Sequence, residues 1–215
     1  MKRLLLVGLI TLVAFGVTYA GGERMTNQGT HSLNFLMNGL GTFGVMGFPA
    51  GTVNGNWMYG FGGAYFIQTD LAIRAGVTFN RWNSNQKTSG GESDDTELAF
   101  GLAPALLWYC VGEGAVAGYW GPTALFGMWS DESKFTPTSG TGSSTKTTYT
   151  DFGFGFLMGA QWWAWSQVAF NAEYVLAWHT SSSKVETSGT SVDGPTYTTI
   201  GIYSWSVGLS LFFAR

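Results

Sequence analysis

The segment from Tyr203 to Phe213 alternates between two kinds of residue over its whole length. Its odd positions are all large and apolar, whereas its even positions are small or polar, with Phe212 as the exception. Successive side chains of a β-strand point to opposite faces, so a two-residue period predicts a strand with one apolar face. A chain built from such strands folds into an antiparallel sandwich or barrel.

The same alternation recurs through most of the chain. It is clear in residues 57–65, 71–80, 98–108, 152–159 and 168–179. Residues 31–45 and 115–129 are less regular, but the spacing of the other segments requires a strand in each. We therefore predict an all-β fold: an eight-stranded, antiparallel, up-and-down transmembrane β-barrel spanning residues 31–215.

The connections between these segments alternate in length. Three are short, at residues 68–70, 111–114 and 164–167. The others are longer and polar, and we expect loops at about 46–56, 83–95, 130–150 and 181–197. Short turns on one side and long loops on the other are typical of outer-membrane barrels, so both termini are expected on the periplasmic side.

Composition separates this prediction from a soluble sandwich or lipocalin-like barrel, in which the apolar face would point inward. Charged residues make up only 11% of the chain and aromatic residues 16%. The face opposite the apolar stripe is mostly Gly, Ala and Ser, which cannot fill a sandwich interior but suit a narrow lumen. The mean hydropathy of +0.11 is too low for a bundle of membrane helices.

The first twenty residues have the pattern of a cleaved signal peptide. Lys2 and Arg3 precede an apolar run from Leu4 to Val17, and Ala20 ends a small-residue cleavage motif. A membrane-anchoring helix is the alternative, because the run approaches spanning length. We expect a short periplasmic segment at 21–30, and a mature chain of 8 Lys and Arg against 13 Asp and Glu. This net charge of −5 and the lack of a basic cluster argue against nucleic-acid binding.

Two segments carry a resemblance to a known family. Residues 65–76 read Tyr-Phe-Ile-Gln-Thr-Asp-Leu-Ala-Ile-Arg-Ala-Gly, and residues 206–213 read Ser-Val-Gly-Leu-Ser-Leu-Phe-Phe. They resemble a strand–turn–strand unit and the closing strand of small outer-membrane barrels of the OmpA/OmpX type. The resemblance implies location in the bacterial outer membrane, with periplasmic chaperones and the barrel-assembly machinery as partners during biogenesis. This chain departs from the family by adding Ala214 and Arg215 after the terminal aromatic residue.

Aromatic residues gather near both sets of connections, where the two membrane interfaces would lie. We expect an aromatic girdle made of Trp57, Tyr65, Trp82, Trp108, Trp129, Trp162, Trp163, Trp178 and Phe213.

The inward positions of the strands contain a small set of polar residues. We expect a polar network in the lumen made of Asn34, Asn38, Arg74, Gln161, Asn171 and Glu173. A charge at membrane depth needs a partner, so one hypothesis is an Arg74–Glu173 pair bridged by the amides. The alternative is that trapped water solvates each residue separately.

Pro104 and Pro122 fall within predicted strands and nearly opposite one another. Proline removes a hydrogen bond from a sheet, so we predict a bulge or kink in that hairpin, facing the lumen. The alternative is that the strands there have other boundaries.

Few residues point to chemistry. Cys110 is the single cysteine, and the two histidines, His31 and His179, are expected at opposite ends of the barrel, so we predict no metal site and no cofactor. The His179-Thr180-Ser181 spacing resembles the active site of outer-membrane lipid A 3-O-deacylases, but Glu186 is the nearest acid and no other part of that pattern is present.

The expected function is therefore that of a non-enzymatic barrel that contacts membrane lipid and lipopolysaccharide. It would stabilise the envelope or bind a surface ligand, as in adhesion, through its polar loops. Two alternatives stay open: a small porin-like pore for tiny solutes, and a lipid A-modifying hydrolase.

Overall fold

The computed structural model describes residues 22–38, 58–110 and 114–213, and these residues form eight antiparallel strands and no helix. The strands are β1 (His31–Asn38), β2 (Met58–Gln68), β3 (Leu71–Thr88), β4 (Gly91–Cys110), β5 (Val116–Pro137), β6 (Ser143–Trp165), β7 (Val168–Thr187) and β8 (Thr190–Phe213). Each strand pairs with the next along the chain, and β1 pairs with β8 from His31↔Phe213 to Asn38↔Ser206, which closes the barrel. The predicted eight-stranded up-and-down barrel is confirmed.

Some predictions fall on residues that the structure does not describe. The expected signal peptide at 1–20, the expected loop at 46–56 and Trp57 lie outside the described residues. Within the described ranges, no helix is long and apolar enough to span a membrane.

The two faces of the barrel wall differ as the alternation predicts. On β7, Phe170, Tyr174 and Leu176 are exposed on the outside, whereas Asn171 and Glu173 are buried inside. The outward apolar residues of the strands form an exposed stripe, which we call the apolar belt. The belt comprises residues 73–79 on β3, 102–108 on β4, 120–128 on β5, 152–158 on β6 and 170–178 on β7. A water-exposed wall would not carry so many large apolar side chains, so the belt is the surface that faces lipid.

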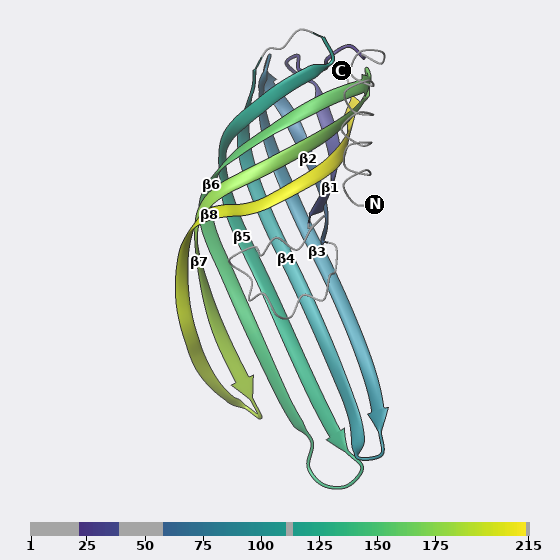
Figure 1. The fold of residues 1–215 in the computed structure, drawn as a ribbon, viewed down its shortest axis with the longest axis vertical. Coiled ribbons are helices and arrows are strands. Elements are labelled where there is room, and N and C mark those ends of the chain that lie inside the picture. Colours follow the sequence, from purple (N-terminus) through teal and green to yellow (C-terminus); the bar gives the residue numbers. More distant parts are fainter. Residues whose placement is uncertain (1–21, 39–57, 111–113, 214–215) are drawn as a thin grey trace, which may run out of the picture.

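The short connections lie at one end of the barrel, as expected. The β2–β3 turn places Asp70 at φ 64°, and Gly114 precedes β5 at φ 85°. Figure 1 shows this end at the top, with β3 to β6 continuing far past the level of β1 and β2 toward the opposite end.

Most residues of the segments expected as long loops at 83–95, 130–150 and 181–197 lie in strands, so this expectation is wrong. β3 and β4 stay paired from Leu71↔Trp108 to Thr88↔Gly91, and β5 and β6 out to Phe135↔Ser143. A polar composition predicts a loop, but a strand with water on both sides is also polar on both faces. Threonine, which is common in these segments, also favours strands. We call these parts of β3 to β8 beyond the belt the hairpin extension.

Charged residues on the outer face of the hairpin extension match across the strands. Lys146 lies opposite Glu132 on β5 and opposite Glu186 on β7, and Asp94 lies opposite Lys134. Cross-strand pairs of opposite charge stabilise a sheet, so the extension carries its own pairing signal outside the membrane.

The structure shows no bulge at Pro104 and Pro122, although the β4–β5 pairing is interrupted between Leu102 and Trp108 except at Ala105. The β4–β5 register is the same at Leu102↔Phe126, Ala105↔Thr123 and Trp108↔Trp120, so no residue is inserted between them. Both prolines are exposed on the outer face and do not line the lumen. Each keeps its partner on the other side, Ala75 for Pro104 and Phe156 for Pro122, and the Thr123 hydroxyl donates a hydrogen bond to the Pro104 carbonyl at 2.9 Å.

Candidate functional site in the lumen

Arg74 on β3 and Glu173 on β7 form a bidentate ion pair inside the barrel, although 99 residues separate them in sequence. Nη1 of Arg74 donates to Oε1 of Glu173, and Nη2 donates to Oε2 at 2.9 Å. Both side chains are buried. Of the two arrangements considered from the sequence, direct pairing is the one present, and it compensates both charges in a region where an isolated charge would be costly.

Neighbouring hydroxyl and amide groups complete this polar layer. The Tyr119 hydroxyl donates to Oε1 of Glu173 at 2.6 Å, and Nδ2 of Asn171 donates to the same oxygen at 3.3 Å. The Tyr109 hydroxyl donates to Oε1 of Gln161 at 3.0 Å. A carboxylate that accepts several hydrogen bonds and a bidentate guanidinium is held in one position, so the layer braces the strands that contribute to it against each other.

The remaining residues of the predicted network lie apart from this layer. Asn34 is buried, but its Oδ1 accepts a hydrogen bond from the Ser32 hydroxyl at 3.0 Å on the same strand. Asn38 is the last residue of β1, and its side chain lies outside what the structure describes. The structure thus unites Arg74, Asn171 and Glu173, and connects Gln161 to them through the packed rings of Tyr109 and Tyr119.

An aromatic plug fills the lumen between the polar layer and the short turns. Its members are Phe66, Tyr109, Tyr119, Trp163 and Phe212, all buried. Tyr109 lies 5.1 Å from both Phe66 and Tyr119 between ring centroids, and Trp163 lies 5.6 Å from Phe212. These distances are those of packed aromatic rings, so the short-turn end of the lumen is filled by side chains.

The segment from Gly22 to Thr30 crosses the same end of the barrel. The Gly22 amide donates to the Trp163 carbonyl at 3.0 Å, and the Thr26 hydroxyl donates to Oδ1 of Asp70 at 2.6 Å. Met25 packs against the buried cluster that contains the plug. The segment therefore covers the plug and holds it to the β2–β3 and β6–β7 turns.

Tyr109 and Tyr119 were missed as lumen residues, although the sequence carried a signal for them. Tyr109 continues the inward odd positions of Ala103 and Ala105, and it pairs with Tyr119 across the β4–β5 turn. Position near a turn had suggested an interfacial role, but alternation along the strand decides the face.

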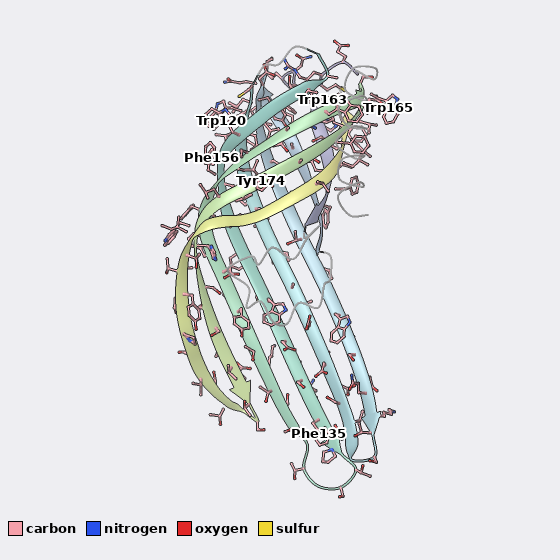
Figure 2. All side chains as sticks on the ribbon, viewed as in Figure 1. Trp120, Phe135, Phe156, Trp163, Trp165 and Tyr174 are labelled. Atoms are coloured by element: carbon pink, nitrogen blue, oxygen red, sulfur yellow. The ribbon has the colours of Figure 1, made fainter. Side chains whose placement is uncertain are left out.

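The predicted girdle divides between the two faces. Tyr65, Trp108, Trp178 and Phe213 are exposed on the outer face, and Trp162 stacks there on Phe170 at 5.7 Å. Trp163 is 0% exposed and Trp129 is 6% exposed, and both point into the barrel, so neither belongs to a lipid-facing girdle. Trp82 is partly buried and shares the inward positions of β3 with Arg74. Adjacent residues of a strand point to opposite faces, so Trp162 faces outward and Trp163 faces inward. Figure 2 labels Trp163 and Trp165 at the short-turn end.

A second group of buried polar residues lies where the lumen meets the hairpin extension. Asp151 on β6 pairs in register with Ser181 on β7, and His179 lies opposite Gly153. All three polar side chains are buried on the inner face. His31 lies at the other end of the barrel and stacks on Phe213 at 5.6 Å. In the part of the chain that the structure describes, no three His, Cys, Asp or Glu residues are arranged to hold a metal ion.

Several solved structures of bacterial outer-membrane proteins are similar to this chain at low sequence identity. Ail, the attachment invasion locus protein of Yersinia pestis, is 14% identical over 86% of this chain and 99% of that chain, with a TM-score of 0.41. A major outer membrane protein of Thermus thermophilus is 10% identical over 86% and 99%, with a TM-score of 0.47. Acinetobacter baumannii CarO is 10% identical over 85% and 97%, with a TM-score of 0.43.

No protein-family model and no curated protein matches the sequence. The sequence identities and TM-scores of these solved structures are low, so they do not carry the fold assignment. The assignment of a barrel rests on the strand pairing of this chain itself.

Proposed function

We propose that this chain is a non-enzymatic, integral outer-membrane β-barrel protein whose hairpin extension presents a binding surface outside the cell. The observation that carries the proposal is the division of one barrel into two parts. The part near the short turns has an apolar belt outside and a filled lumen inside, and the other part is a mostly polar sheet that extends beyond the belt. A stable scaffold that raises a water-exposed sheet above a membrane is suited to contact with a surface ligand, as in adhesion.

The filled lumen weighs against the alternative of a small pore. A pore needs a continuous water path, whereas the aromatic plug and the Arg74–Glu173 layer occupy successive levels of this interior. The lipid A-modifying hydrolase has less support. His179 and Ser181 are buried on the inner face, and a lipid substrate would lie against the outer face.

The proposed partners follow from the surfaces of the barrel. The apolar belt would contact membrane lipid and lipopolysaccharide acyl chains, and the polar sheet would contact a ligand in the medium. Assembly would use periplasmic chaperones and the barrel-assembly machinery. An envelope-stabilising role without a ligand is the second candidate, because a plugged barrel also serves as a rigid membrane element.

Single cysteines test the proposed location and orientation. In a Cys110→Ser background, Ser89→Cys lies at the tip of the β3–β4 hairpin, and Gln167→Cys lies in the β6–β7 turn. A membrane-impermeant maleimide should label Ser89→Cys on intact cells, and should label Gln167→Cys only after the outer membrane is permeabilised. The reverse pattern would refute the orientation, and equal labelling of both on intact cells would refute membrane insertion.

Adhesion assays then test the role. Replacing residues 83–96 by a two-residue Asn-Gly turn removes the tip of the β3–β4 hairpin and keeps the pairing up to Arg81↔Leu98 and Trp82↔Glu97. Cells producing this variant should adhere less to matrix-coated surfaces than cells producing equal amounts of the unmodified protein. Unchanged adhesion together with increased detergent sensitivity in a deletion strain would favour the envelope-stabilising role instead.

A further inference from the structure

In the described residues, the inner face of the hairpin extension carries carboxylates and no lysine or arginine. Asp95 and Glu97 on β4, Asp131 on β5 and Asp151 on β6 all share the inward positions of their strands. In the described part of the extension, every lysine and arginine takes an outward position, as Lys134 and Lys146 do. We call the inward surface from Asp151 to Asp95 the vestibule. A concave, single-sign surface concentrates counter-ions of the opposite charge.

Two of these carboxylates face each other without an intervening cation. Glu97 is directly opposite Asp131 in the β4–β5 register, whereas the outer-face residues of the same strands lie opposite partners of opposite charge or polar partners. Asp95, one inward position farther along β4, accepts a hydrogen bond from the Ser133 hydroxyl at 2.6 Å. Like charges directly opposite destabilise a sheet. The arrangement therefore has a cost in the unliganded protein that a bound cation would relieve.

Aromatic rings line the vestibule beside the carboxylates. Trp129 lies one inward position from Asp131 along β5 and stacks on Tyr149 with a centroid distance of 4.8 Å. Trp82 is directly opposite Glu97 on β3. Indole and phenol rings attract ammonium groups through the negative face of the ring, and they combine with carboxylates in sites for organic cations.

Asp151 supplies an independent sign of a missing partner. Its side chain is 4% exposed, it points inward, and its Oδ1 atom has no hydrogen-bond partner. Its neighbour across β5 is Gly127, which places no side chain over the carboxylate. Ser181 and His179 on β7 lie beside this carboxylate and favour its ionised form, but Oδ1 itself accepts no hydrogen bond. A buried carboxylate oxygen without a donor is unfavourable, so a ligand that donates to Oδ1 would be favoured here.

The two acidic positions are separated by a defined length. Asp151 pairs with Gly127, and Asp131 lies four residues along β5 from that glycine, which corresponds to about 13 Å at the rise of a strand. The Trp129–Tyr149 pair lies between them. This spacing is close to the length of an extended linear triamine or tetramine and exceeds that of a short diamine.

We propose that the vestibule binds linear aliphatic polyamines, with one terminal ammonium group at Asp151, the other between Glu97 and Asp131, and the methylene chain against Trp129 and Tyr149. The inference rests on the proposed function only for the side from which the ligand enters. Binding to the purified protein does not depend on that orientation, so its failure and a failure of the labelling experiment are distinguishable.

Calorimetric titration of the full mature protein in detergent micelles, at about 0.15 M salt to screen diffuse attraction, tests the proposal. Spermidine should bind saturably with one site, and putrescine should bind more weakly because it is too short to reach both positions. Asp151→Asn and the double variant Glu97→Gln/Asp131→Asn should each weaken spermidine binding by at least about tenfold.

The matched control removes two carboxylates from the opposite face of the same hairpin. Glu92→Gln/Asp94→Asn changes the net charge as much as the inner double variant does, and it should leave spermidine affinity within about twofold. Circular dichroism and the mobility shift between unheated and boiled samples verify that each variant is folded. Absence of saturable binding, equal weakening by the outer control, or equal affinity for putrescine and spermidine would each overturn the proposal.

Discussion

At the residue scale, Arg74 and Glu173 carry charges that are each costly to bury alone, but together they form an ion pair inside the barrel. Each charge is tolerated because the other is within direct hydrogen-bond contact and because Tyr119 and Asn171 donate to the same carboxylate. A single member left without its partner would be a buried, uncompensated charge. Single and double substitutions of this pair should therefore differ in how much they lower the free energy of unfolding.

Removing one member should be worse than removing both. Glu173→Gln leaves the Arg74 guanidinium buried and uncompensated, and should lower the free energy of unfolding by about 3 kcal/mol. The double variant Arg74→Leu/Glu173→Leu should cost less than Glu173→Gln, because it leaves no buried charge. Urea unfolding of protein refolded into lipid vesicles measures both. Equal stability of Glu173→Gln and the unmodified chain would contradict this account of the lumen.

The Glu97–Asp131 pair should have the opposite effect on stability. The pKa of Glu97 is raised by partial burial and by Asp131 and Asp95, and the pKa of Asp131 is raised by partial burial and by Asp95. The neighbours in register on β3 and β6, Trp82 and Thr147, are uncharged. The folded protein therefore binds more protons than the unfolded chain between the ordinary and the raised pKa values, so stability from these groups falls as pH rises through that window.

Neutralising this pair should accordingly stabilise the protein at neutral pH. Glu97→Gln/Asp131→Asn should increase the free energy of unfolding at pH 7 by roughly 0.5 kcal/mol, the scale of a cross-strand pair. The gain should shrink as the pH falls to about 4, where carboxyl groups become protonated. Urea midpoints at about pH 4 and at pH 7 without polyamine measure the difference. A variant less stable than the unmodified protein at pH 7 would contradict mutual repulsion.

At the element scale, β5 contains a proline, Pro122, and a glycine in close contact with β4, Gly121, and its neighbouring strands accommodate both residues. Pro122 points outward and keeps its pairing with Phe156. Gly121 next to it lies so close to β4 that an added Cβ would be 1.7 Å from the Leu106 carbonyl oxygen. The β4–β5 contact therefore depends on glycine at this position, with no change in register.

A single methyl group should reveal this dependence. Gly121→Ala should destabilise the barrel by about 3 kcal/mol, because one strand must move away from the other. Gly118→Ala on the same strand is the control, since its Cβ would be 3.9 Å from the nearest atom, the Gly159 carbonyl oxygen. Unfolding midpoints in urea compare the two. Similar midpoints for both variants would show that β4 and β5 are not in close contact at Gly121.

The hairpins were the elements least predictable from sequence. Residues 83–95, 130–150 and 181–197 carry the Ser, Thr, Gly and Lys content of loops, yet nearly all of them lie within strands. The alternation that marks a strand in the membrane comes from lipid on one side. Beyond the belt both sides are wet, and the periodic signal disappears while the hydrogen-bonded pairing continues.

At the scale of the whole molecule, the lumen is closed in successive levels from the short turns outward. The segment from Gly22 to Thr30 covers the end, the aromatic plug fills the interior next to it, and the Arg74–Glu173 layer follows. The unmodified protein should therefore give no stable conductance steps in planar lipid bilayers.

Enlarging the lumen at the plug should change this result. Phe66→Ala/Trp163→Ala removes two fully buried rings. This variant should produce measurable current steps in planar lipid bilayers. Phe170→Ala removes an outer-face ring of the same size class and should stay silent. Stable steps from the unmodified protein would favour the pore alternative over the proposed function.

The sequence by itself determined the strands, their inner and outer faces, the short turns and the number of strands, because a two-residue period is a local property of the backbone. It also brought Arg74 and Glu173 forward as a candidate pair, since both occupy inward positions. The tertiary structure decided what those positions meet. Closure of β1 on β8 sets which strands face each other across the lumen, and this brings together Arg74 and Glu173, 99 positions apart. The register of β4 against β5 places Glu97 opposite Asp131. Such contacts depend on register and closure around the whole barrel, which no local pattern specifies.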